Sequence, residues 1–180
     1  KLPGYMTWDD IRLAIQMGFD IGAHTASHAH LADQSLTEAR LEIDESNKRY
    51  EAELGFVPQL FAYPYGEASL SVRSAVKAAG YRAGFGQHSG VLHNSDDMFY
   101  LPRFALNETY GAIDRFRTLA SAIPLMVTDI TPPDMTISPD SNPPAFGFTV
   151  DPSIGSLSTL ACYASGIGRL NLNHLGQRRF

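Results

Sequence analysis

Short apolar runs alternate with amphipathic segments through the first 120 residues, and this alternation restricts the fold more than any other feature. Two amphipathic segments, at about residues 7–18 and 35–55, begin with a Thr or Ser capping pattern and end at a glycine. Apolar runs at 19–23 and 60–63 follow them and are expected to be strands. Strands that alternate with helices of this length predict βα units around a parallel sheet.

The same rhythm continues to about residue 122. Four further elements are expected: a helix from Ser69 or Ser71 to Ala79, a strand at 81–85, a strand within 99–106 that Pro102 interrupts, and a helix capped by Asn107 or Thr109. The aromatic side chains expected in the sheet core are Phe19, Phe61 and Tyr81.

The character of the sequence changes near residue 124, where proline becomes dense and helical periodicity ends. We expect a Pro-rich linker at 124–144 and the start of a β-rich accessory domain at 145–180, with strands within 145–150 and 157–164. Residues 1–123 would then form the α/β domain.

The composition excludes several classes of function. The net charge of −5 argues against a nucleic-acid-binding surface, which needs clustered Lys and Arg. No apolar run approaches the roughly 20 residues that span a membrane. The single cysteine, Cys162, excludes an internal disulfide and a cysteine zinc cluster, and it is expected to be a buried apolar residue.

Two histidines four residues apart, His24 and His28, follow the first apolar run. Imidazoles are good zinc ligands near neutral pH, and this spacing, equal to one helical turn, allows both to face one point. Thr25 and Ser27 offer hydroxyls that can hold the ligands in place. His30 adds a third imidazole that should point elsewhere. The alternative is a surface pair without a metal.

Three polar segments follow predicted strands: the histidine pair, residues 63–65 and residues 87–90. Ligand sites in parallel α/β folds lie at the carboxyl ends of the strands. The sequence therefore predicts that these segments share one rim.

The stretches 22–28 and 61–66 resemble the second and third motifs of the polysaccharide deacetylase family, also called the NodB-homology or carbohydrate esterase family 4 domain. The third motif has the variant typical of the poly-N-acetylglucosamine deacetylase branch. The resemblance covers about residues 5–120. It implies an α/β fold of the deformed (β/α) barrel type, which we expect to be incomplete here.

The resemblance also implies a metal-dependent hydrolase that removes N-acetyl groups from amino-sugar polysaccharides or oligosaccharides. A divalent metal, most commonly Zn²⁺, would be held by His24, His28 and an aspartate. The backbone N–H of Tyr65 would stabilise the oxyanion, and Tyr63 and Pro64 would contact the substrate. The alternative for both tyrosines is an aromatic residue of the core or rim.

Several departures from the family pattern matter. The first motif, which supplies the base and the aspartate ligand, has no match. Asp9 and Asp10 are similar to it in sequence, but they lie at the start of a predicted helix, where acidic side chains interact favourably with the helix dipole. We expect the base and third ligand upstream of Lys1, and the 180 residues alone to be inactive. Ala62 replaces the motif arginine, and Arg103 is expected either to fill its place or to be a surface residue.

The general acid of the family has no clear match in the sequence. His88 is the candidate and His93 is a second one, although each is also a plausible solvent-exposed loop residue. His174 falls in the predicted β-rich region and is expected to be unrelated to the site.

Two other functions stay open: a zinc amidase acting on another cell-wall amide, and a non-catalytic carbohydrate-binding or scaffold module. Ala62 and the missing general acid favour the module. For the enzyme, the resemblance implies an N-acetylated glycan as partner and a periplasmic, cell-envelope or secreted location.

Overall fold

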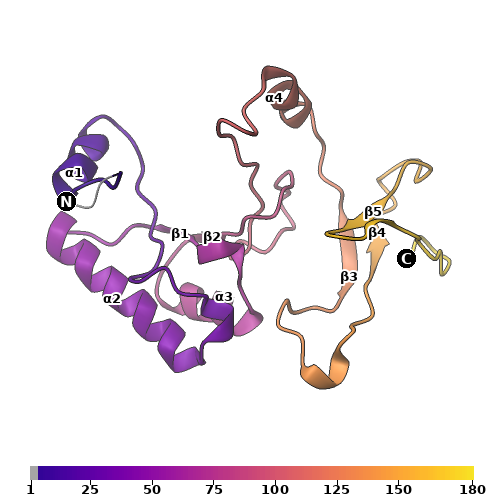
Figure 1. The fold of residues 1–180 in the computed structure, drawn as a ribbon, viewed down its shortest axis with the longest axis horizontal. Coiled ribbons are helices and arrows are strands. Elements are labelled where there is room, and N and C mark those ends of the chain that lie inside the picture. The colour runs from indigo at the N-terminus through magenta and orange to yellow at the C-terminus, as the bar shows by residue number, and fades with distance from the viewer. Residues whose placement is uncertain (1–3) are drawn as a thin grey trace. The chain divides into compact units, whose positions relative to one another are not determined.

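The computed structural model describes residues 4–180, and the chain divides into two compact units. The first ends at Ser121, and the second runs from Ala122 to Phe180 (Figure 1). Across residues 4–180, no helix combines the length and apolar character needed to cross a membrane.

The first two helices begin where the sequence predicts. Helix α1 (Trp8–Gln16) has Thr7 as its N-cap, and helix α2 (Leu36–Leu54) has Ser35; both carry a complete capping box. The hydroxyl and N–H groups of Ser35 donate to the Glu38 carboxylate and lower the pKa of that carboxyl group. Capping satisfies backbone donors that each helix start would otherwise leave unpaired.

Four neighbouring segments run parallel in the order of the chain. Strand β1 (Leu60–Ala62) pairs with strand β2 (Ala83–Phe85), and single bridges join Ala23 to β1 and Leu101 to β2. Parallel neighbours that follow one another along the chain are what successive βα units produce. The first unit is therefore mixed α/β, as predicted.

The strands are shorter than expected. The predicted strand at 19–23 reduces to a single bridge between Ala23 and Phe61, the central residue of β1. The strand within 99–106 reduces to the bridge at Leu101, since the following Pro102 has no N–H to continue the pairing.

The predicted aromatic core is confirmed for Phe61 and Tyr81, which are buried. It is wrong for Phe19, whose side chain is 61% exposed. The reason is that Phe19 precedes the single paired residue of its segment, at an open cavity of about 590 Å³ that Ile15 and Phe56 also line.

Helices α2 and α3 (Leu70–Ala78) pack together over the short strands and bury one core, seen in the lower part of the first unit in Figure 1. Ser69 is the N-cap of α3: its hydroxyl accepts from Val72 N–H. The buried residues of this core are Ala23, Leu31, Ala39, Ile43, Phe61, Tyr63, Ala68, Val72, Ala75, Val76 and Tyr81. Short 3-10 turns lie at Leu31–Asp33 and Pro64–Gly66.

Helix α4 spans Ile113–Ala120 and begins later than predicted. Asn107 does not cap it, because its side chain accepts from the N–H groups of Thr109 and Tyr110 and closes a turn. Gly111 allows that turn, since a Cβ there would lie 2.6 Å from the Asn107 carbonyl oxygen.

The second unit contains two antiparallel pairs. Strand β3 (Val127–Thr131) pairs with β4 (Gly147–Val150), and β5 (Cys162–Ala164) pairs with β6 (Gly168–Leu170). The stretch 124–144, expected to be a linker, thus holds one strand of a pair as well as a 3-10 turn at Pro139–Ser141.

Candidate active site

His24 follows Ala23, the residue that bridges to β1, so the backbone pairing places its side chain at the end of the parallel segments. Its Nδ1 atom lies 2.6 Å from the carbonyl oxygen of Ala62. A carbonyl only accepts hydrogen bonds, so the neutral ring carries its proton on Nδ1. The Nε2 lone pair is then left to bind a metal, as in many zinc–histidine sites.

His28 reaches His24 through a tight loop and not through a helical turn. Thr25 and His28 both have positive φ, at 66° and 63°, and the Thr25 hydroxyl accepts from His28 N–H at 3.0 Å. Ser27 donates to the Glu42 carboxylate of α2 through its N–H and its hydroxyl. The loop thereby brings the two imidazole rings edge to face, with centroids 4.8 Å apart.

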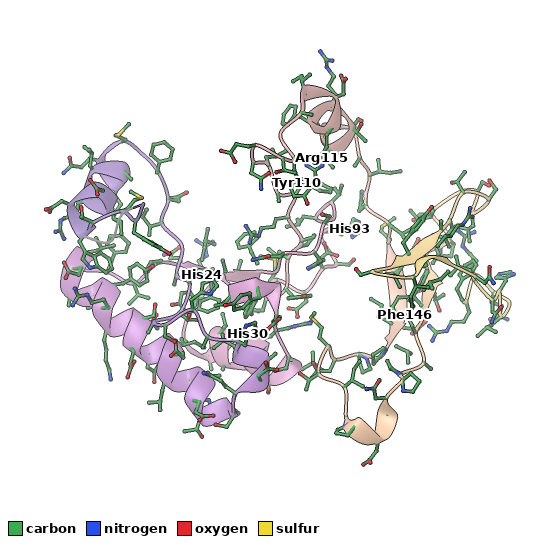
Figure 2. All side chains as sticks on the ribbon, viewed as in Figure 1. His24, His30, His93, Tyr110, Arg115 and Phe146 are labelled. Carbon is green, nitrogen blue, oxygen red and sulfur yellow. The ribbon has the colours of Figure 1, made fainter. Side chains whose placement is uncertain are left out.

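Tyr65 joins this cluster from the turn that follows β1. Its ring meets His28 edge on, with centroids 4.7 Å apart, and stacks flat on His30, with centroids 3.7 Å apart and the ring planes 1° from parallel. The Glu67 carboxylate lies 2.8 Å from Nδ1 of His30. Figure 2 labels His24 and His30 in this part of the first unit.

The backbone around Tyr65 is held on its C-terminal side. Gly66 has φ +75°, and a Cβ on it would lie 2.4 Å from the backbone nitrogen of Gln87. The Tyr100 hydroxyl donates to the Gly66 carbonyl oxygen at 3.0 Å. Only glycine fits this position, because both the left-handed conformation and the neighbouring chain exclude a side chain.

Tyr63 and Pro64, expected to contact the substrate with a core position as the alternative for Tyr63, are buried in the core. The Tyr63 hydroxyl donates to the carbonyl oxygen of Phe99 at 2.7 Å, which gives the buried phenol a partner. Burial is the main cause that raises the pKa of Tyr63. Their packing follows from the turn, which points Tyr65 outward and its two predecessors inward.

Arg103 and His88, expected in catalytic roles, lie on the later segments of the rim. The Nε of Arg103 donates to the carbonyl oxygen of Gly86 at 2.8 Å. The His88 ring stacks on Tyr100, with centroids 4.5 Å apart, and the Arg73 guanidinium lies 4.0 Å from the centre of the same tyrosine ring. Burial, and then the Arg73 charge, lower the pKa of His88.

The two remaining candidate histidines make contacts of other kinds. His93 lies in a loop where its Nδ1 is 2.8 Å from the Ser95 hydroxyl. His174 belongs to the second unit, where its ring packs against Phe180.

The donor chemistry of His24 and His28 fits a zinc ion, which accepts neutral imidazole nitrogens. Within the described range 4–180, no cluster of three or more His, Cys, Asp or Glu side chains is arranged to hold a metal. The pair thus offers two of the four ligands that a zinc site requires.

Sequence reasoning missed the contribution of His30, Glu67 and Tyr100. His30 was expected to point elsewhere, and it does not contact the imidazole pair directly, but it joins the cluster through Tyr65. Glu67 and Tyr100 do not belong to either of the two motifs. The available signal was positional and covers two of them, since His30 and Glu67 each lie in a segment that follows a predicted strand.

Comparisons with solved structures show the fold. The chain is similar to the deacetylase PplD of Streptococcus pyogenes in complex with acetate (18% identity, TM-score 0.61, 66% of this chain and 52% of that one). It is similar to a polysaccharide deacetylase from Bacillus cereus (20% identity, TM-score 0.57, 66% of this chain and 38% of that one). It is also similar to a de-N-acetylase from Aggregatibacter actinomycetemcomitans (18% identity, TM-score 0.55, 64% of this chain and 53% of that one). The chain spans about half or less of the length of each of these proteins.

The sequence comparison agrees with the motifs. Residues 4–84 match the family described as polysaccharide deacetylase, and this segment contains His24, His28 and Tyr65. This match covers a little under half of the chain and lies entirely within the first unit.

Proposed function

We propose that the protein is a metal-dependent hydrolase that removes N-acetyl groups from an amino-sugar polysaccharide or oligosaccharide. The observation that carries this proposal is the pair His24 and His28 beside Tyr65, with the Nδ1 proton of His24 held by Ala62. The match of residues 4–84 to the polysaccharide deacetylase family and the similarity to a de-N-acetylase support the reaction class.

His24 and His28 are the proposed ligands of a divalent metal, most commonly Zn²⁺. When bound, the ion would supply Lewis-acid polarisation of the amide carbonyl and activation of water. The Tyr65 backbone N–H would donate to the carbonyl oxygen as that atom gains negative charge. The third ligand and the catalytic base are proposed to come from residues outside this sequence, since two imidazoles do not complete a site.

Arg103 and His88 keep secondary roles in the proposal. Arg103, on the same rim, would substitute for the motif arginine that Ala62 replaces and would orient the missing carboxylate. His88 would protonate the leaving amine, and its lowered pKa would make its protonated form a stronger acid. Replacing Arg103 by Ala is expected to lower kcat more than replacing Arg82, an exposed arginine bound to Gln59.

The proposal has consequences beyond the site. The first unit would be part of a deformed (β/α) barrel, which its parallel segments in chain order support. The second unit would be a β-rich accessory domain. An N-acetylated glycan as partner, and a periplasmic, cell-envelope or secreted location, follow from the family.

The test uses the full-length protein, purified with zinc, and measures acetate released from N-acetylglucosamine oligomers together with bound zinc. His24→Ala and His28→Ala are expected to lose both zinc and activity. His93→Ala is the matched control, because this histidine bonds within its own loop, and it is expected to retain both. Unchanged acetate release in His24→Ala would exclude the proposal.

A non-catalytic carbohydrate-binding module is the second candidate, and Ala62 at the arginine position of the third motif favours it. The same experiment separates the two functions. A module would bind the oligomer, release no acetate and be insensitive to zinc removal. A zinc amidase acting on another cell-wall amide would instead hydrolyse peptidoglycan stem amides in preference to the oligomer.

A further inference from the structure

We propose that His30 is a positioning residue that, together with Glu67, fixes Tyr65 in the conformation that aims its backbone N–H at the reacting carbonyl. This inference rests on the proposed function. It concerns a residue that lies outside the metal pair and that acts through Tyr65.

The contact between the two rings is specific. His30 and Tyr65 stack with centroids 3.7 Å apart and planes 1° from parallel, which is full face-to-face overlap of two flat side chains. Glu67 holds Nδ1 of His30 at 2.8 Å and thereby fixes the orientation of the ring. The stack and the hydrogen bond together connect the loop that carries His28 to the turn that carries Tyr65.

Tyr65 needs such support because its backbone is in an unfavourable conformation. Its φ is 57°, in the left-handed region that residues with a side chain rarely adopt. Such residues persist only where the surroundings over-determine them. On the C-terminal side, Gln87 and Tyr100 fix Gly66.

The Tyr65 ring contacts the rings of His30 and His28, and the residue is still 46% exposed. Without His30, the edge contact with His28 would hold the ring alone. The turn could then relax toward negative φ, and the N–H would rotate away from its target.

The geometry also separates His30 from the metal ligands. Its Nδ1 faces Glu67 and one ring face is covered by Tyr65, whereas its described contacts do not include the rings of His24 or His28. Its replacement should therefore change the chemical step and leave metal content intact.

The experiment compares His30→Ala, His30→Leu and His30→Phe in the full-length, zinc-loaded protein, with kcat, KM and bound zinc measured on N-acetylglucosamine oligomers. Ala and Leu are expected to lower kcat about tenfold, because a misaligned oxyanion donor weakens transition-state binding. KM and zinc content should stay within about twofold, as expected for an interaction lost only in the transition state. Phe keeps a flat ring for the stack on Tyr65 but loses the hydrogen bond to Glu67, so its kcat should lie between those of Leu and the wild type.

Three results would overturn the inference: an unchanged kcat in His30→Ala, a loss of zinc in that variant, or a Phe variant no better than Leu. If His30→Ala does not fold, the comparison of Leu with Phe decides alone. His24→Ala is assayed in parallel: if it retains activity, the proposed function fails. If it is inactive while the His30 variants match the wild type, only the positioning role fails.

Discussion

His24 and Ala62 are joined by a 2.6 Å contact between the imidazole Nδ1 and a main-chain carbonyl oxygen. Because that oxygen cannot donate, we predict that neutral His24 is the Nδ1–H tautomer in the metal-free protein. The ¹⁵N shifts of the ring, recorded at alkaline pH, report which nitrogen carries the proton.

His93 provides an internal comparison for that measurement. The Ser95 N–H donates to its Nδ1, so His93 is expected to carry its proton on Nε2. The two rings should give opposite patterns in one spectrum. A His24 ring protonated on Nε2 would contradict the contact with Ala62.

Gly66→Ala is expected to destabilise the first unit more than Gly55→Ala does. The two glycines have nearly equal φ, +75° and +76°, so the backbone penalty of about 1–2 kcal/mol is shared. Only Gly66 has a neighbour, the Gln87 nitrogen, 2.4 Å from the new Cβ, whereas nothing lies within 4 Å at Gly55. We predict that Gly66→Ala costs about 1–3 kcal/mol more. Urea unfolding measures both variants, and equal losses would contradict the close approach.

Tyr63 is expected to make the protein less stable at high pH. Burial raises its pKa in the folded state above the ordinary value of about 10. The stability that the neutral phenol contributes is complete below pH about 10 and is lost as the pH rises further, because the unfolded chain releases the proton first.

The measurement is the free energy of unfolding at several alkaline pH values, for the wild type and Tyr63→Phe. The variant should lose about 1 kcal/mol at neutral pH with the hydrogen bond to Phe99. Above pH about 10, its free energy of unfolding should fall less steeply with pH than that of the wild type. The difference in slope should correspond to at most one proton. Identical slopes would show that Tyr63 ionises as easily in the folded protein as in the unfolded chain.

His88 is expected to titrate below the ordinary histidine pKa of about 6.5 in the folded protein. Burial is the first cause and the Arg73 charge the second, so Arg73→Gln should move this pKa part of the way back. Because the folded pKa is the lower one, the contribution of His88 to stability is present above pH about 6.5 and is lost as the pH falls through the folded value.

An NMR titration of the His88 ring, in the wild type and in Arg73→Gln, measures this shift. Arg82→Gln removes the same charge from an exposed arginine that is bound to Gln59, and it should leave the His88 titration unchanged. An equal response to both substitutions would show that Arg73 exerts no specific effect.

The helix starts were predictable because capping is local chemistry. Thr7 and Ser35 each bond to a residue three positions on, so the signal lies within one turn of sequence. The predicted start of α4 was wrong because the same local chemistry is ambiguous at Asn107. An asparagine side chain caps a turn as readily as a helix, and the sequence does not distinguish the two. Strand lengths were overestimated because pairing depends on distant partners such as β1.

The site was predictable only as far as its motifs extend. The pairing of His24 with His28 followed from their spacing, although a loop with two left-handed residues delivers it. The sequence left Tyr63 open as a substrate contact or a core aromatic, and it is buried because the turn after β1 points its ring into the core. The stack of His30 on Tyr65 joins segments 35 residues apart, and no local pattern encodes it.

The parallel segments of the first unit are neighbours in space in the same order as along the chain, from Ala23 through β1 and β2 to Leu101. Every pairing therefore joins consecutive segments of the first unit, and none of these pairings involves the second unit. On the ribosome, each strand would find its partner as soon as the next one emerges. The rim that carries His24 and Tyr65 would thus assemble early, before the β-rich unit has been synthesised.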